Sequence, residues 1–151
     1  MEVQIDNRQD KLKIPLKKIQ KTAGAILNAL DFPDGELSIL LVDDQQIAKL
    51  NLRYLNRKGP TNVIAFSMRE GQFNDITPNL LGDVVISLET ARSEANAAQI
   101  SLQNRFNELL IHGILHLLGY DHEQTQKEAD RMEEKSNWLL ERIDKCKIAG
   151  V

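Results

Sequence analysis

The chain of 151 residues contains three histidines, and all three lie within one stretch near its C-terminal end. The stretch reads His112-Gly-Ile-Leu-His116-Leu-Leu-Gly119-Tyr-Asp-His122. The first two histidines are four positions apart, so on a helix of about 3.6 residues per turn their imidazoles leave the same face one turn apart. Gly119 readily takes the left-handed conformation that ends a helix, which allows His122 to return toward the pair. The spacing therefore predicts a metal site with three imidazole ligands.

The residues around the first two histidines predict that their helix is buried. Apolar residues surround it on almost every side, which is typical of a core helix. They are Leu109, Leu110, Ile111, Ile114, Leu115, Leu117 and Leu118. Imidazole nitrogens held among such residues need a partner, because burying an unpaired polar atom costs free energy. A divalent cation would satisfy both rings at once.

The ligand set indicates zinc in a catalytic site. Three neutral imidazoles with a fourth position open to water are typical of catalytic zinc, whereas structural zinc normally has four protein ligands. We expect one ion per chain, although imidazole also accepts other divalent transition metals such as nickel, copper or iron. Asp121 and Glu123 adjoin His122, and Asp121 is the better candidate for a hydrogen bond that orients an imidazole. The single cysteine, Cys146, is distant in sequence and is not expected to be a ligand.

Length and composition indicate one domain that spans residues 1–151. With 42% hydrophobic residues, the chain can form a core without a disulfide or a second domain. Its first thirteen residues lack the apolar block of a signal peptide. No stretch reaches the length of a membrane span. We therefore expect a cytoplasmic protein that does not interact with membranes.

Hydrophobic periodicity and turn residues predict alternating strands and helices, and thus an α/β (α+β) fold. Pro15, Asp43 or Asp44, Ser87 and the Thr125-Gln-Lys-Glu128 capping box mark helix starts. The expected strands are residues 3–7, 37–42, 63–68 and 82–87. The expected helices are residues 15–30, 44–54 and 88–99, one from 101 that carries the first two histidines, and one from 125. The longest irregular segment is residues 69–81, and loops of this length are more often functional than structural.

Charge is unevenly distributed along the chain. The net charge of −3 argues weakly against a general nucleic-acid binder. Between Asp44 and Glu70, however, there is no acidic residue, and the segment contains Lys49, Arg53, Arg57, Lys58 and Arg69. These cations either form a solvated helix face or, if the segment folds beside the metal, a wall that binds phosphate through residues such as Arg53 and Arg57.

The histidine spacing matches that of the metzincin proteases, with one difference. Their motif has a glutamate directly after the first histidine, where it acts as general base, and this chain has Gly113. Without that base a peptidase mechanism is disfavoured. A zinc-bound water with a pKa of about 7 could instead cleave a phosphodiester, whose leaving group the metal and nearby cations can stabilise.

Four blocks of the chain resemble the YbeY family of bacterial rRNA maturation endoribonucleases. They are the histidine stretch, Leu50-Asn51-x-x-Tyr54, Pro60-Thr61-Asn62-Val63-Ile64-Ala65-Phe66 and Leu81-Gly82-Asp83-Val84-Val85-Ile86-Ser87. The resemblance implies a single domain with a small mixed four-stranded sheet, about five helices and a zincin-like metal helix. It also implies a zinc site at His112, His116 and His122. The implied activity is cleavage of single-stranded RNA, with roles in 16S rRNA 3′ end processing and ribosome quality control, and with the ribosome or its small-subunit components as partners and no DNA substrate.

Two positions depart from the family pattern. Many members have an arginine five residues before the proline of the Pro60-Thr61 block, and this chain has Leu55 there; Arg57 or Arg53 are candidates for that role. Ala65 replaces the usual serine, which is a tolerable strand substitution. Two other functions stay open: a non-catalytic RNA-binding factor for ribosome assembly with a structural metal, and a metallopeptidase-like hydrolase.

Overall fold

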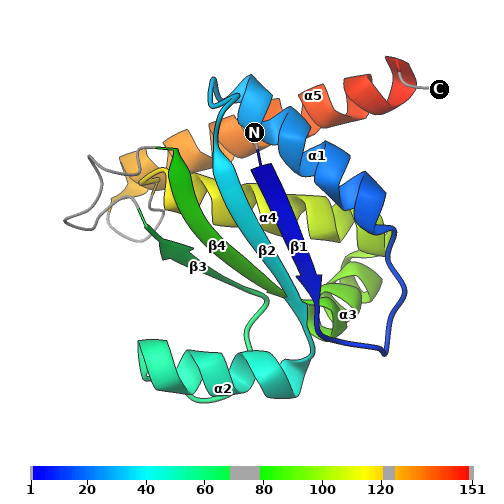
Figure 1. Ribbon diagram of the computed structural model, residues 1–151, viewed down its shortest axis with the longest axis vertical. Helices are drawn as coiled ribbons and strands as arrows, with labels where there is room; N and C mark the ends of the chain where they lie inside the picture. Colours follow the sequence, from blue (N-terminus) through cyan, green and yellow to red (C-terminus); the bar gives the residue numbers. More distant parts are fainter. Residues whose placement is uncertain (1, 69–78, 121–124, 150–151) are drawn as a thin grey trace.

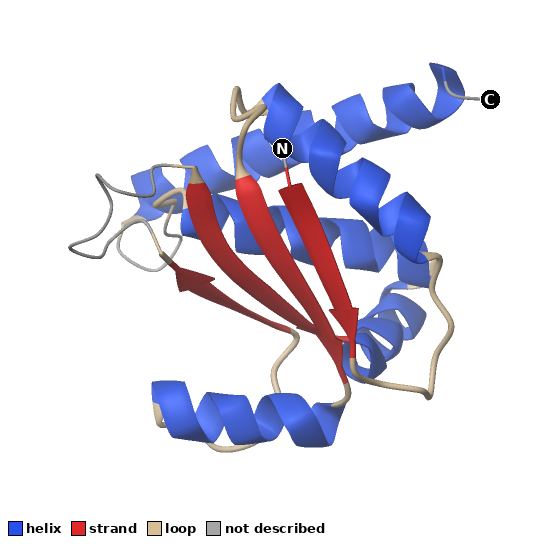
Figure 2. Cartoon of the chain, in the orientation of Figure 1, coloured by secondary structure: helices blue, strands red, loops and turns tan. Residues whose placement is uncertain are grey.

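The computed structural model describes residues 2–68, 79–120 and 125–149 as four strands and five helices. The strands are β1 (Glu2–Asn7), β2 (Glu36–Val42), β3 (Val63–Ser67) and β4 (Leu80–Ser87). The helices are α1 (Leu16–Ala29), α2 (Asp44–Leu55), α3 (Leu88–Ala98), α4 (Leu102–Leu117) and α5 (Gln126–Ala149). The predicted α/β alternation is confirmed (Figures 1 and 2). None of the helices in these ranges has the length and apolar character of a membrane span.

The strands form one mixed sheet in the order β1-β2-β4-β3. β1, β2 and β4 are parallel, with Val3 opposite Leu37 and Ile39 opposite Val84. β3 runs antiparallel to β4 at the edge of the sheet. Parallel neighbours require a crossover connection, and α1 connects β1 to β2, while α2 and β3 lie between β2 and β4 in the chain. The mixed four-stranded sheet that the family resemblance implies is therefore confirmed.

The helices cover the two faces of the sheet unequally. A large core joins one face to α1, α3, α4 and α5, with fully buried side chains such as Ile26, Phe106 and Leu110. On the opposite face, Ile47 and Leu50 of α2 pack against Ile64 and Val85 in a smaller cluster. Figure 1 shows α2 below the lower ends of the strands, α4 behind the sheet, and α1 and α5 at the upper right. Consequently α2 and α4 lie on opposite faces.

Side-chain caps fix where four helices begin. Asp43 accepts a hydrogen bond from the Gln46 N–H at 2.8 Å, and the Gln46 side chain accepts one from the Asp43 N–H at 3.0 Å. The Oγ atoms of Ser87, Ser101 and Thr125 accept hydrogen bonds from backbone N–H groups three residues later. Such caps satisfy donors that have no partner within the helix. The predicted starts of the last four helices are thus confirmed within one residue.

One strand differs from its expected bounds because of a bulge. β4 begins at Leu80, two residues before the predicted start, and its register with β2 shifts after Leu80 opposite Glu36, so that Gly82 faces Leu37. Gly82 has a φ of 140°, and a Cβ there would lie 2.1 Å from the Phe66 carbonyl oxygen. Only glycine fits this conformation and this contact. Residues 69–78 of the predicted loop lie outside the described residues.

Candidate active site

The first two predicted ligands lie side by side on α4. His112 and His116 leave the same face of the helix, and their Nε2 atoms are 3.1 Å apart. Their rings meet edge to face with centroids 4.6 Å apart. Both side chains are half-buried, although the helix around them is buried. The i, i+4 spacing therefore brings two imidazole nitrogens to one point, as predicted.

The separation of the two nitrogens suits one metal ion. Two Zn–N bonds of about 2.0–2.1 Å at a tetrahedral angle place their nitrogens about 3.3–3.4 Å apart, close to the observed 3.1 Å. The same distance also fits a hydrogen bond in which one ring donates and the other accepts. The donor set and its convergence fit a zinc ligand pair without any rearrangement of the helix.

The third predicted ligand lies outside the described residues, together with Asp121 and Glu123. The structure ends α4 at Leu117 and places Gly119 at a φ of 96°, which is the left-handed break that the sequence predicts. His122 as a ligand therefore stays a prediction. Within the described ranges, no three His, Cys, Asp or Glu side chains cluster as a metal site would require. Cys146 belongs to α5, and its side chain is not described.

Gly113 faces the sheet. A Cβ at this position would lie 2.6 Å from Val84 Cγ1 and 3.3 Å from Val63 Cγ2, which is closer than side chains normally approach. The absence of a side chain therefore lets α4 pack directly on β3 and β4. A glutamate does not fit at this position without moving α4 away from the sheet, because its Cβ would already meet Val84.

A pocket of about 260 Å³ opens beside His112. One wall is the start of β3, with Asn62 and Val63, and the opposite wall is α5, with Ser136 and Asn137. Arg105, Glu108, Leu109 and Ile111 line it from α4, and Leu140 lines it from α5. A histidine that lines a pocket with an arginine and a carboxylate is a suitable place for phosphodiester chemistry.

Arg105 is the cation of this pocket, and the sequence interpretation missed it. Its Nη2 and Nε bind Glu94 Oε1 at 3.0 and 3.1 Å, and its Nη1 binds Glu108 Oε1 at 2.9 Å. Burial lowers the pKa of Arg105, but the hydrogen bonds to Glu108 and Glu94 outweigh it and hold the pKa above its ordinary value. Asn62 also donates to Glu94 at 3.2 Å. The guanidinium is thus charged and fixed.

The sequence contained a signal for this pair. Glu108 and Arg105 precede His112 by four and seven residues, which places them one and two turns away on the same helix face.

Comparison with known proteins identifies the family of the chain. A family model described as "Endoribonuclease YbeY" matches residues 4–144. The chain belongs to the YbeY family.

The individual relatives agree over nearly the whole chain. Endoribonuclease YbeY of Geobacter sulfurreducens is 48% identical over 141 residues, covering 93% of this chain and 94% of the relative. Endoribonuclease YbeY of Syntrophotalea carbinolica is 47% identical over 142 residues, covering 93% and 95%. A solved structure of a Thermotoga maritima protein matches with a TM-score of 0.67 at 22% identity, covering 98% of this chain and 93% of that one. This last similarity supports the fold.

The block Leu50-Asn51-x-x-Tyr54 lies at the end of α2 and contacts the loop that follows it. Asn51 is buried, and its Nδ2 donates to the Gly59 carbonyl oxygen at 3.0 Å. Asn56 ends α2 in the left-handed conformation with a φ of 54°. The basic residues Arg57 and Lys58 lie in the loop that this hydrogen bond closes, and their side chains are exposed.

The basic residues do not line the pocket of His112. Arg53 lies in the last turn of α2 and Arg57 in the loop after it, and both are absent from the walls of that pocket. α2 and α4 pack on opposite faces of the sheet, so phosphate contacts by Arg53 and Arg57 stay a prediction. Leu55, at the position of the family arginine, is exposed.

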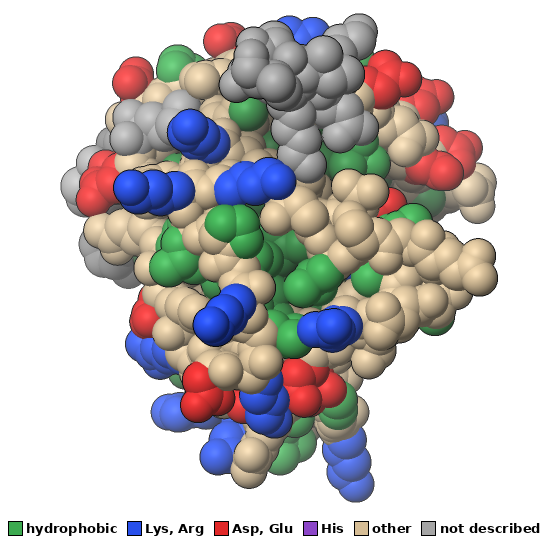
Figure 3. Space-filling view, turned by 90° about the vertical axis from the view of Figure 1, so that its right-hand side faces the viewer, with side chains coloured by type: hydrophobic (Ala, Val, Ile, Leu, Met, Phe, Trp, Pro, Cys, Tyr) green, Lys and Arg blue, Asp and Glu red, His purple; other side chains and the backbone are tan. Residues whose placement is uncertain are grey.

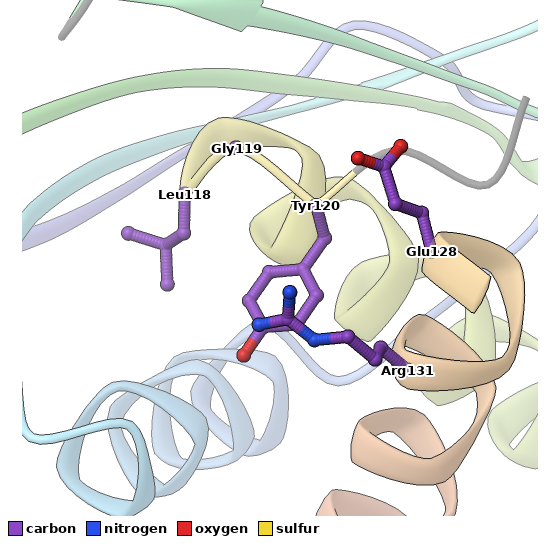
Figure 4. Close-up of a pocket in the computed structure, with 5 residues that line it drawn as sticks. All are labelled: Leu118, Gly119, Tyr120, Glu128 and Arg131. Atoms are coloured by element: carbon purple, nitrogen blue, oxygen red, sulfur yellow. The ribbon is translucent and has the colours of Figure 1, made fainter. Parts of the chain in front are cut away.

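A second hollow lies beyond the end of α4. Leu118, Gly119, Tyr120, Glu128 and Arg131 line it, and Figure 4 shows the Arg131 guanidinium across the Tyr120 ring. Glu128 Oε2 is buried without a hydrogen-bond partner among the described residues. A capping box at Thr125 predicts that the Glu128 carboxylate accepts a hydrogen bond from the Thr125 N–H. Oε2 of Glu128 does not make this bond. An unpaired buried acceptor needs a donor, and the sequence interpretation did not predict this feature of Glu128.

Proposed function

We propose that this protein is a metal-dependent endoribonuclease that cleaves single-stranded RNA during rRNA maturation. The observation that carries this proposal is the convergence of the His112 and His116 nitrogens on α4, 3.1 Å apart, in a chain of the YbeY family. The names of the relatives support the activity. Processing of the 16S rRNA 3′ end and ribosome quality control are the proposed settings, with ribosomal small-subunit components as partners in the cytoplasm.

We assign the metal as one zinc ion per chain, held by His112, His116 and His122. When bound there, zinc supplies Lewis acidity that stabilises negative charge on a phosphodiester. The chain supplies the other functions. Neutral imidazoles keep their Nε2 lone pairs for coordination. Arg105 stays charged at every physiological pH, and its ion pairs with Glu94 and Glu108 hold it in the wall of the pocket of His112.

The proposal is tested with His116→Ala, using Asn104→Ala as a control at an exposed position of the same helix. Zinc content should fall from about one ion per chain to near zero, because two imidazoles make a weak site. RNA cleavage should fall with it by about 100-fold or more. The measurements are element analysis, cleavage of a labelled single-stranded RNA, and melting temperature. The control should leave all three unchanged.

Other outcomes would decide between the alternatives. Cleavage that persists in metal-free His116→Ala would overturn the metal-dependent mechanism. A parent protein that binds RNA without cleaving it, together with a large fall in the melting temperature of His116→Ala, would support the assembly factor with a structural metal. Metal-dependent cleavage of unfolded protein substrates would support a peptidase, for which Gly113 leaves no base.

A further inference from the structure

Tyr54 is an aromatic residue at the end of a helix stripe that packs on the sheet. Ile47, Leu50 and Tyr54 follow one another at helical spacing and face the sheet, and the first of these is fully buried. Tyr54 is 56% exposed. Figure 1 shows the end of α2 on the side of the molecule where β3 forms the edge of the sheet. The ring therefore continues the packing stripe but leaves more than half of its surface to solvent.

Two contacts hold this ring in place. The Phe66 ring of β3 meets it edge to face, with centroids 5.5 Å apart and planes inclined at 73°. The Arg53 guanidinium lies 5.4 Å from the Tyr54 centroid. Edge-to-face pairs and cation–π contacts both fix ring orientation. We call the two rings with this guanidinium the Tyr54–Phe66 platform.

The surroundings of the platform are apolar and positively charged. Leu55 is the last residue of α2, and Met68 is the residue after β3. Both side chains are exposed. Arg53, Arg57 and Lys58 form no ion pair within the described part of the chain. Asp83, opposite Phe66 in the β3–β4 register, is exposed. Its charge disfavours phosphates over β4, so the favourable path for a polyanion follows the end of α2.

The platform and the histidines are connected through one edge strand. Phe66 packs on the α2 face of β3, while its neighbour Ser67 donates to the Leu117 carbonyl oxygen of α4 at 3.4 Å. Leu117 directly follows His116. A single-stranded polymer that crosses the outer edge of β3 would thus pass from the Tyr54–Phe66 platform to the face of the sheet that α4 covers.

We propose that the Tyr54–Phe66 platform stacks an unpaired base of single-stranded RNA. Aromatic rings and arginine planes stack on bases in a way that tolerates any sequence and requires the base to be free of a duplex. A base that displaces Arg53 from the ring can be covered by the same guanidinium on its other side. This inference rests on the proposed function, because it names the feature that would make the nuclease select single strands.

The experiment compares Tyr54→Leu, Tyr54→Phe and Tyr54→Trp with Trp138→Leu as the control. Trp138 is also exposed, and the cations of Lys135 and Arg142 lie near its ring. It differs from Tyr54 in position, because it lies on α5. Binding of a fluorescein-labelled oligouridine is measured by anisotropy, and a gel verifies that the probe stays intact. The same length of abasic RNA backbone and an RNA duplex serve as further probes. Melting temperatures verify folding.

Loss of one stacked base should weaken binding of oligouridine to Tyr54→Leu by about 5- to 100-fold. Tyr54→Phe and Tyr54→Trp should bind within about twofold of the parent, because the π face remains. With abasic RNA, Tyr54→Leu and the parent should bind equally, and Trp138→Leu should match the parent on every probe.

The proposal is overturned if Tyr54→Leu binds oligouridine as the parent does, if it loses equal affinity for abasic RNA, or if Trp138→Leu loses as much. Should Tyr54→Leu unfold, weak binding by both Tyr54→Phe and Tyr54→Trp would overturn it, and parent-like binding by both would support it. A parent that cleaves no RNA but shows the expected binding pattern would refute the nuclease while leaving the platform in place.

Discussion

At the scale of single residues, Gly113 sets the distance between α4 and the sheet. We predict that Gly113→Ala lowers the free energy of unfolding by about 1–3 kcal/mol, because the added methyl would lie 2.6 Å from Val84 Cγ1. The higher helix propensity of alanine offsets about 1 kcal/mol of this cost. Urea denaturation followed by circular dichroism measures the change.

A double-mutant cycle with Val84→Ala identifies the cause of the loss. Truncating Val84 removes the atoms that a Cβ at position 113 meets first, so Gly113→Ala should be less destabilising in that background, and the two changes should not be additive. Additive effects would mean that the close approach of α4 to the sheet is not what Gly113 provides.

Some residues of the site could be predicted from the sequence, and others could not. The His112–His116 pair was predictable because both residues lie on one helix, where spacing alone determines geometry. The contacts of Arg105 with Glu94 and, through Glu94, with Asn62 join α3, α4 and the start of β3. Such contacts depend on tertiary packing, which periodicity does not encode. For the same reason, the sequence left open whether Arg53 and Arg57 form a solvated helix face or a phosphate-binding wall.

At the scale of elements, α2 depends on its N-terminal cap. We predict that Asp43→Ala lowers the free energy of unfolding by about 1 kcal/mol, because it removes the acceptor that binds the Gln46 N–H at 2.8 Å. The urea midpoint should fall while the slope of the transition stays constant, since the surface exposed on unfolding is unchanged.

Gln45→Ala is the matched control, at an exposed position in the first turn of the same helix. It should leave the midpoint within about 0.5 kcal/mol of the parent in free energy. If both variants lose equal stability, the loss in Asp43→Ala would not come from the capping box.

Helix starts were predictable because their signals are local, and strand order was not. Asp43, Ser87 and Ser101 each accept a backbone hydrogen bond from within their own next turn. The order β1-β2-β4-β3 results from long-range pairing. The early start of β4 at Leu80 depends on pairing with Glu36 of β2, a contact between segments far apart in the chain.

At the scale of the whole molecule, two regions carry positive charge in a protein whose net charge is −3. One is the end of α2 with its loop, where Arg57 and Lys58 are exposed. The other includes α1 and the segment before it, with exposed side chains at Lys13, Lys17 and Lys18. Figure 3 shows the side of the molecule near that segment, where positive side chains are separated by apolar and acidic ones. Removing positive charge from each region in turn and comparing RNA binding identifies the RNA-binding face.

We predict that Arg57→Ala with Lys58→Ala weakens RNA binding and cleavage, whereas Lys17→Ala with Lys18→Ala does not. Both pairs remove two exposed positive charges, so they change the net charge equally and differ only in position. Each phosphate contact on a single strand contributes about 0.7 to the slope of log affinity against log salt concentration. The first pair should therefore reduce the magnitude of that slope by about 1.4, and zinc content and melting temperature should match the parent. Equal losses in the two double variants would show that net charge alone drives binding, and a loss confined to the Lys17 and Lys18 pair would assign the RNA-binding face to α1.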